Sequence, residues 1–99
     1  MKPAIERIST ALRRARNVQG LSQRRLAEQV GMTQAQISRI EQALSDPRLS
    51  TVVELARALN LELVLVPRQL LPAVRALERQ KAGDGDQALP LYRLEGDDD

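Results

Sequence analysis

Residues that end helices divide the chain into short segments, and their spacing limits what it can fold into. Gly20 and Gly31 each follow a stretch of helical periodicity, and Asn60 follows another. Both residue types adopt the left-handed backbone conformation that closes many helices. Pro47 adds a fourth interruption, because the residue before a proline is disfavoured in the helical region. The sequence therefore predicts several short helices rather than one long helix.

Four segments between these interruptions carry apolar residues at the spacing of a helix. The expected helices span 4–19, 23–30, from the Thr33 cap to about Ala43, and 49–59. Ser22 is suited to cap the second helix, and Thr33 with Gln36 forms a capping-box pattern at the start of the third. A further short helix is expected over 69–80, with Pro72 near its first turn.

The residue types in the chain exclude several kinds of protein. At 99 residues there is room for one modest core, and with Tyr92 as the only aromatic residue that core must be aliphatic. There is no cysteine and no histidine, which excludes disulfides, thiolate chemistry and the usual general base. No cluster has metal-ligand spacing, and no nucleotide-binding glycine pattern occurs. We therefore expect no enzyme, no metal and no cofactor.

Charge is unevenly distributed along the chain. Residues 1–81 contain 14 Lys and Arg against 7 Asp and Glu, a net charge of +7, whereas residues 82–99 have a net charge of −5. A basic body favours a polyanion as partner, and an acidic end favours a different partner or screens the first. The first ten residues carry charges where a signal peptide is apolar, and no apolar run is long enough for a membrane span. A cytoplasmic protein with no membrane partner is expected.

The segment 61–66 (LELVLV) interrupts the helical pattern. It is short, rich in branched residues and ended by Pro67, which favours a β-strand. A lone strand has an unpaired edge, and the simplest partner is the same strand of a second copy across a two-fold axis. The predicted dimer contacts are Leu61, Leu63, Val64, Leu65 and Val66. The alternative is that the strand pairs within its own chain, with residues 89–94.

Two of the short helices lie on either side of Gly31, an arrangement that suggests a helix-turn-helix. Ile37 and Ile40 are placed to hold the third helix against the core. Its other face is then free to enter a DNA major groove, with the positive end of the helix dipole near phosphate. The residues on that face are Gln34, Ala35, Ser38 and Arg39.

The stretch LSQRRLAEQVGMTQAQISRIE resembles the Cro/repressor (XRE) family of helix-turn-helix proteins, and the third helix with the following strand is most similar to HipB-type antitoxins. The agreement covers roughly residues 5–60. The agreeing positions are Ser22-Gln23, Leu26-Ala27, Gly31, Gln34, Ile37-Ser38, Glu41 and Pro47.

The resemblance implies an all-α, five-helix lambda-repressor-like fold with one short C-terminal β-strand paired across a homodimer. The glycine and acidic residues at the end of the chain add a disordered acidic tail to this expectation. We expect a DNA-binding domain over 1–60, a dimerisation strand and short helix over 61–80, and a flexible acidic tail over 81–99.

The resemblance also implies roles for individual side chains. Gln23 would bind a phosphate, and Arg16 would pair with Glu41 inside the domain. Gln36 is the capping partner at the third helix, with a structural role or a phosphate contact, and Arg48 is either a phosphate contact or a solvated charge. The candidate DNA-binding residues are Gln23, Arg24, Thr33, Gln34, Ala35, Gln36, Ser38, Arg39, Ser45 and Arg48.

These expectations lead to a sequence-specific repressor that binds a near-palindromic operator in double-stranded DNA as a homodimer, and that is associated with the nucleoid when bound. The HipB-type resemblance implies an antitoxin that represses its own operon and holds a HipA-like kinase toxin. The alternative is a stand-alone XRE-family regulator without a toxin. Leu91, Tyr92 and Leu94 are the candidate partner-binding residues, since an acidic disordered segment with a few apolar anchors often folds on its partner.

Overall fold

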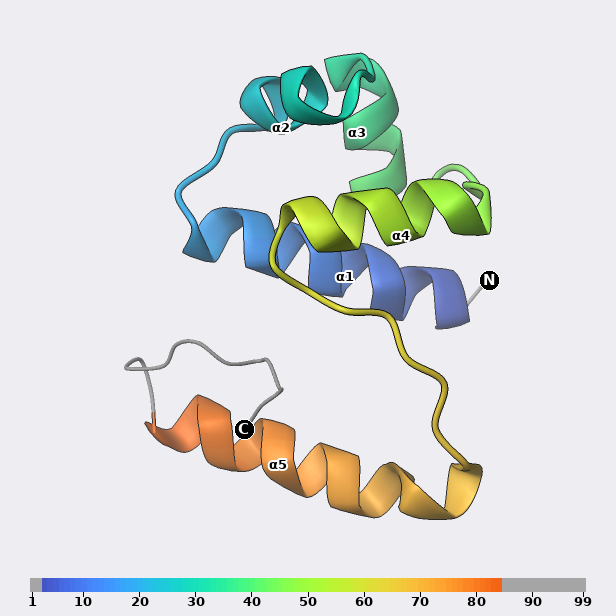
Figure 1. Ribbon diagram of the computed structural model, residues 1–99, viewed down its shortest axis with the longest axis vertical. Helices are drawn as coiled ribbons and strands as arrows, with labels where there is room; N and C mark the ends of the chain where they lie inside the picture. Colours follow the sequence, from blue (N-terminus) through green and yellow to red (C-terminus); the bar gives the residue numbers. More distant parts are fainter. Residues whose placement is uncertain (1–2, 85–99) are drawn as a thin grey trace. The chain divides into compact units, whose positions relative to one another are not determined.

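The computed structural model describes residues 3–84 of the chain. Within that part the regular structure is helical, and the all-α prediction is confirmed there. The chain divides into two units, Met1–Leu61 and Glu62–Asp99. The first unit contains α1 (Pro3–Val18), α2 (Gln23–Val30), α3 (Gln34–Glu41) and α4 (Leu49–Ala58) (Figure 1). The described part of the second contains a 3-10 turn, η1 (Arg68–Leu70), and α5 (Leu71–Asp84).

The left-handed conformation ends the helices at the three positions where it was predicted. Gly20, Gly31 and Asn60 have φ angles of 67°, 71° and 61°. At the end of α2 the backbone N–H of Gly31 donates to the carbonyl oxygen of Ala27, which satisfies one of the last helix carbonyls. The chain can therefore turn sharply between α2 and α3.

The third helix is shorter than predicted, because it ends at Glu41 and not near Ala43. Ala43 has a φ of 59°, a conformation that costs an alanine roughly 1–2 kcal/mol. The backbone N–H of Leu44 donates to the carbonyl oxygen of Arg39 at 2.9 Å, so the turn satisfies a free carbonyl at the end of the helix. Alanine favours helix strongly, and for that reason the sequence pattern did not reveal this turn.

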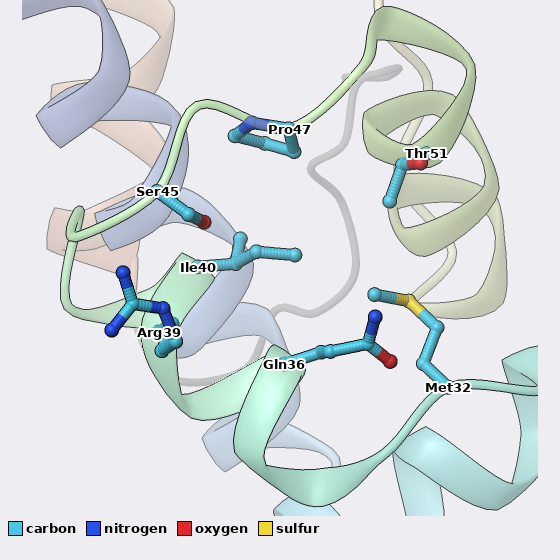
Figure 2. Close-up of a pocket in the computed structure, with 7 residues that line it drawn as sticks. All are labelled: Met32, Gln36, Arg39, Ile40, Ser45, Pro47 and Thr51. Atoms are coloured by element: carbon cyan, nitrogen blue, oxygen red, sulfur yellow. The ribbon is translucent and has the colours of Figure 1, made fainter.

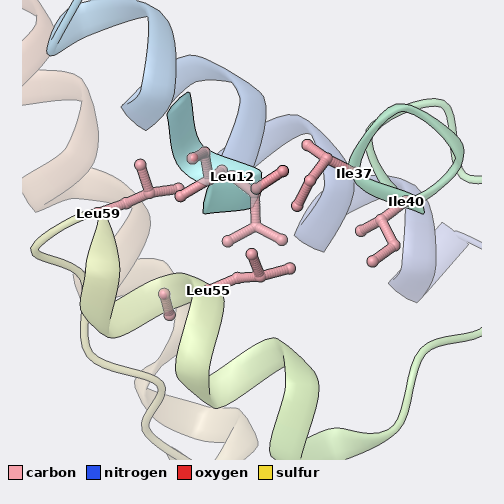
Figure 3. Packing of buried hydrophobic residues seen from close by; sticks show 8 residues of the cluster. Leu12, Ile37, Ile40, Leu55 and Leu59 are labelled. Carbon is pink, nitrogen blue, oxygen red and sulfur yellow. The ribbon is translucent and has the colours of Figure 1, made fainter. Parts of the chain in front are cut away.

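The core of the first unit is aliphatic, as predicted, and all four helices contribute to it. Leu26, Ile37, Leu55 and Leu59 are the most completely buried side chains, and Leu12 of α1 belongs to the same cluster (Figure 3). Burial of each such side chain stabilises the fold by about 1.5–3 kcal/mol. Within this unit α3 packs against both α1 and α2, and α2 packs against α4.

Two long-range hydrogen bonds add to this packing and hold α1 to later parts of the unit. The buried hydroxyl of Ser9 donates to the carbonyl oxygen of Ile40 in α3. Just after the C-terminal end of α1, Gln19 Nε2 donates to the carbonyl oxygen of Leu59 at 2.6 Å. A buried hydroxyl needs such a partner, because leaving it unpaired is costly. The last turn of α3 is thus fixed by polar as well as apolar contacts.

Residues 61–66 do not form a strand within the described chain, where they are irregular. A strand exists only as part of a hydrogen-bonded ladder, and no described segment of the chain pairs with this one. Leu65 is 98% exposed and Val64 is 66% exposed, although both are apolar. The predicted pairing within the chain, with residues 89–94, falls outside the described residues.

The helix predicted over 69–80 is present as α5, but it starts later, at Leu71, and extends further, to Asp84. The described helix therefore includes residues 81–84, which were predicted to belong to the flexible tail. Lysine and alanine at positions 81 and 82 favour helix, and one glycine near the end of a helix costs only about 1 kcal/mol. The remaining predictions for the tail, including the anchors Leu91, Tyr92 and Leu94, lie outside the described residues.

Candidate nucleic-acid interface

One face of α3 is buried in the core, and the other is polar and accessible. Ile37 and Ile40 are 1% and 5% exposed, so they hold the helix against the rest of the unit. Their three-residue spacing keeps both on the same side of the helix. On the accessible side Gln34, Ala35 and Arg39 are exposed and Ser38 is half-buried. The structure therefore presents these four predicted side chains to solvent on a helix whose position is fixed.

The predicted capping box at the start of α3 is confirmed. Thr33 Oγ1 accepts a hydrogen bond from the backbone N–H of Gln36 at 3.1 Å, and Gln36 Oε1 accepts one from the backbone N–H of Thr33 at 2.8 Å. These bonds satisfy two donors that the first helical turn would otherwise leave open. The cap fixes where α3 begins, and with it the position of Gln34 in the first turn.

The structure brings Gln23 and Gln34 together, although they belong to different helices. Gln34 Nε2 donates to Gln23 Oε1 at 3.2 Å, and Gln23 Nε2 in turn donates to Glu41 Oε1 at 3.1 Å. The sequence predicted both glutamines as separate DNA contacts. Their link to Glu41 was not predicted, because Glu41 is 18 residues from Gln23 and no spacing pattern indicates such a contact.

The ion pair between Arg16 and Glu41, which the family resemblance implied, is confirmed. Arg16 Nε donates to Glu41 Oε2 at 2.7 Å, and Arg16 Nη2 donates to Glu41 Oε1 at 2.9 Å. The two side chains are 12% and 4% exposed. The hydrogen bond to Glu41, reinforced by the attraction of its charge, raises the pKa of Arg16 against the opposing effect of burial. The carboxylate of Glu41 is therefore a rigidly held hydrogen-bond acceptor at the C-terminal end of α3.

A shallow hollow of about 220 Å³ lies between the end of α3 and the start of α4 (Figure 2). Arg39 and Ser45 lie on one side of it, and Met32 and Thr51 lie on the other. Arg39 Nη2 donates to the carbonyl oxygen of Leu44 at 3.1 Å, which holds the guanidinium group beside the loop. The full lining consists of Met32, Gln36, Arg39, Ile40, Ser45, Pro47 and Thr51.

Two predicted arginines lie at the starts of helices. Arg24 is exposed in the first turn of α2, and Arg48 is the exposed N-cap residue of α4, where its side chain makes no capping hydrogen bond. The start of a helix carries a partial positive charge that favours anions. Both side chains thus add charge where the backbone already favours a phosphate group.

Sequence reasoning missed Gln42, whose side chain supports Ser38. Gln42 Nε2 donates to Ser38 Oγ at 2.7 Å, so the hydroxyl accepts a hydrogen bond and keeps its own proton to donate. Side chains four residues apart are neighbours on a helix surface. That spacing was the signal in the sequence that could have found this pair.

Among residues 3–84, no group of three or more acidic side chains is placed to hold a metal ion. In the same part of the chain, no helix is both long enough and apolar enough to cross a membrane.

The helices α2 and α3 pack against each other and are joined by a turn at Gly31, whose backbone is left-handed. The second of these helices, α3, presents a polar face to solvent. This arrangement defines a helix-turn-helix protein. The chain belongs to the helix-turn-helix family HTH_3, whose model matches residues 12–66. This match supports the XRE-type assignment and does not extend to the HipB type.

The chain is similar in sequence to a bacterial regulator and in fold to a solved structure. It is 43% identical over 81 residues to an uncharacterized HTH-type transcriptional regulator, y4dL, of Sinorhizobium fredii (strain NBRC 101917 / NGR234). This alignment covers 82% of the chain and 41% of the relative, so the chain spans about two fifths of that protein's length. The crystal structure of the clp gene regulator ClgR from Corynebacterium glutamicum has a similar fold, with a TM-score of 0.57 and 24% identity over 81% of this chain and 82% of that one.

Proposed function

We propose that this chain is a transcriptional regulator that binds a specific sequence in double-stranded DNA. The observation that carries the proposal is the exposed polar face of α3, held in place by buried Ile37 and Ile40 and by the capping box at Thr33. A helix fixed in this way can enter the major groove and bring its first residues to the base edges. Gln34 is the residue we assign to base reading, with Ala35, Ser38 and Arg39 beside it.

The charge of the chain supports the choice of DNA as partner. Residues 1–81 carry a net charge of +7, which favours a polyanion over a neutral or acidic partner. Contacts with phosphate would supply most of the affinity and its dependence on salt, whereas base contacts would supply the specificity. The residues proposed for phosphate contact are Gln23, Arg24, Thr33, Gln36, Ser45 and Arg48.

The experiment that tests this proposal is selection of the full chain's preferred sequence from a pool of random duplex DNA. We expect one enriched sequence, and we expect Gln34→Ala to lose roughly 1–3 kcal/mol of binding free energy at one base position of it. The matched control is Gln29→Ala, which removes an exposed glutamine from α2. An equal loss on every sequence would contradict base reading by Gln34, and the absence of any enriched sequence would contradict the proposal itself.

We propose further that the protein acts as a homodimer joined through residues 61–66. The support is the exposure of this apolar segment, in which Val64 is 66% and Leu65 is 98% exposed. Pairing with the same segment of a second copy would cover it and satisfy its backbone groups. Two copies of α3 would then lie about 34 Å apart, one turn of the duplex, and the operator would be a near-palindrome.

A proline at position 64 tests the dimer, because it removes the backbone N–H that a strand ladder needs. We expect Val64→Pro to be monomeric by sedimentation and to have lower affinity for the selected DNA. Val64→Thr, which keeps both the N–H and the branched side chain, is the control and should remain dimeric. A dimeric Val64→Pro variant would exclude pairing through this segment.

Two kinds of regulator fit the proposed DNA-binding function: an antitoxin that binds a HipA-like kinase toxin, and a stand-alone regulator. The antitoxin form is suggested by the resemblance of α3 to HipB-type proteins and by the net charge of −5 over residues 82–99. Deleting residues 85–99 leaves every described helix intact, so DNA binding should persist in both cases. A kinase-sized protein that co-purifies in equal amount with the full chain, and is lost on this deletion, would identify the antitoxin. DNA without such a partner would identify the stand-alone regulator.

A further inference from the structure

The second unit carries a group of exposed arginines that the helix-turn-helix site does not use. Arg75 and Arg79 are four residues apart in α5, so they are neighbours on the helix surface. Arg68, in η1, precedes Arg75 by about two helical turns, and all three side chains are exposed. Residues 67–81 contain four basic residues and one acidic residue, a net charge of +3. The three arginines together form the α5 basic face.

The apolar side chains of α5 lie on the other side of the helix. The helical period places Val74 and Leu77 roughly opposite the pair of arginines within α5. Leu77 is 52% exposed and Val74 is half-buried. A partner that covers these apolar residues would therefore leave the α5 basic face accessible.

Within residues 3–84, the side chains of the α5 basic face make no hydrogen bond and no ion pair. They differ in this from Arg16, which is bonded to Glu41, and from Arg39, which donates to the carbonyl oxygen of Leu44. Like charges four residues apart destabilise a helix slightly, and an anionic partner would offset that repulsion. The arrangement thus favours binding of an anion over stabilisation of α5 itself.

We propose that the α5 basic face binds phosphate groups of the DNA duplex beside the sequence that α3 reads. This inference rests on the proposed function, in which the chain binds duplex DNA. The planar guanidinium group suits phosphate, because it can donate two parallel N–H groups to two oxygens. The HTH_3 model matches residues 12–66, so this surface lies outside the part of the chain that defines the family.

The length of the connecting segment limits which phosphates α5 can reach. Residues 62–67 join the first unit to η1. An extended chain spans at most about 3.6 Å per residue, so the seven steps from Leu61 to Arg68 span no more than about 25 Å. The phosphates within reach therefore flank the recognised sequence. A second contact on the same duplex adds affinity, because the first contact has already brought α5 close to the DNA.

An anionic membrane surface is the competing partner for a helix with one basic and one apolar side. Helices that lie in a bilayer surface commonly insert Trp, Phe or Leu, and this chain contains no Trp and no Phe. The exposed polar face of α3 in the same chain is suited to duplex DNA instead. DNA is therefore the partner that the observations favour.

The experiment measures how the affinity of the full chain for its selected sequence depends on salt, with ten base pairs added on each side. Arg75→Gln combined with Arg79→Gln removes two charges from the α5 basic face. Each phosphate contact contributes about 0.9 to the slope of log K against log salt concentration, so the slope should fall by about 2 for each bound copy. The loss of affinity at 50 mM salt should exceed that at 200 mM by about tenfold for each copy. Preferences among base sequences should not change, because phosphate contacts do not read sequence.

Two control variants separate a phosphate contact from a general effect of net charge. Arg7→Gln combined with Arg14→Gln removes the same charge from exposed positions on α1 and should change the slope by less than about 1. Arg75→Lys combined with Arg79→Lys keeps both charges and should keep the wild-type slope. On a duplex trimmed to the recognised sequence, the glutamine variant and the wild type should have similar slopes. Circular dichroism and sedimentation verify that each variant keeps its helix content and oligomeric state.

The outcomes separate this inference from the proposed function. Equal slopes for the wild type and the glutamine variant of α5 on the long duplex would overturn the inference and leave the proposed function intact. Equal losses from the α1 and α5 glutamine variants would also overturn it. Equal slopes, together with binding to vesicles of phosphatidylcholine and phosphatidylglycerol that the α5 glutamine variant loses, would assign this face to a membrane surface instead. Failure of the wild-type chain to enrich any sequence would overturn the proposed function.

Discussion

The two units of the chain treat similar residues in opposite ways. In Met1–Leu61 most of the leucines in the helices are buried in one core, and Leu26 is only 1% exposed, although Leu49 at the start of α4 is 70% exposed. In the unit that begins at Glu62, Leu65 is 98% exposed and Leu77 is 52% exposed. Apolar content therefore does not predict burial. The first unit has enough helices to enclose a core, whereas the described part of the second has one turn and one helix.

The comparison indicates that the two units have different roles, one in recognition and the other in binding a second chain. A unit with its own core can hold a recognition surface in a fixed geometry, which specific binding requires. A segment that leaves apolar side chains in solvent is suited to bind another chain, because burial on association then supplies the driving force. The stability of the first unit should therefore depend on its internal contacts, and substitutions in the exposed segment should leave that stability almost unchanged.

The largest effect is expected from Glu41→Ala in the first unit. It leaves the charge of Arg16, which is 12% exposed, without its partner, and breaking a buried pair in this way costs about 3–5 kcal/mol. Urea unfolding monitored by circular dichroism measures the change in the free energy of unfolding. Glu28→Ala, at an exposed position on α2, is the control and should change it by less than about 0.5 kcal/mol. Similar values for both variants would mean that the ion pair is not structural.

The contrast between the two units is tested directly by the same substitution in each. Leu26→Ala should lower the free energy of unfolding by about 2–5 kcal/mol, because it opens a cavity in the core. Leu65→Ala should lower it by less than about 0.5 kcal/mol at protein concentrations where the chain is monomeric. A large loss from Leu65→Ala under those conditions would show that the exposed segment packs on its own chain.

A smaller effect is expected at the start of α3. Thr33→Ala removes the side-chain acceptor of the capping box and should cost about 1 kcal/mol in the free energy of unfolding. Thr33→Ser keeps the hydroxyl and should be close to wild type. Amide hydrogen exchange at Gln36, whose N–H is bonded to Thr33, should accelerate in the alanine variant only. Unchanged exchange at Gln36 would contradict the role of the cap.

The smallest effect concerns pH. Glu41 raises the pKa of Arg16 in the folded protein, so the stabilisation is fully present below the pKa of an unfolded-state arginine and is lost only above it. The cost of Arg16→Met in the free energy of unfolding should therefore be the same at pH 7 and at pH 10. Urea unfolding of wild type and variant at both values provides the measurement. If the cost of the substitution falls by more than about 1 kcal/mol at pH 10, Arg16 loses its proton at a lower pH than its pairing with Glu41 predicts.

Local signals predicted the parts of the fold that depend on a few neighbouring residues. The helix ends at Gly31 and Asn60 and the capping box at Thr33 each follow from preferences within one helical turn. The turn at Ala43 was not predicted, because alanine has no local preference for the left-handed conformation that the turn requires. The extension of α5 to Asp84 was not predicted, because the glycine and acidic residues that follow suggested a loop and the helix-favouring residues at positions 81 and 82 were given less weight.

The sequence by itself determined where most of the helices begin and end, which side of α3 is apolar, and that the chain is basic up to residue 81, because these properties depend on residues within a turn or on simple charge. The family resemblance added the Arg16–Glu41 pair. Only the tertiary structure decided that the same carboxylate also orients Gln23 and, through it, Gln34. Such a chain of contacts requires α1, α2 and α3 to pack in one particular arrangement. Packing of the aliphatic core brings those distant polar groups within hydrogen-bonding distance, and no local pattern records it.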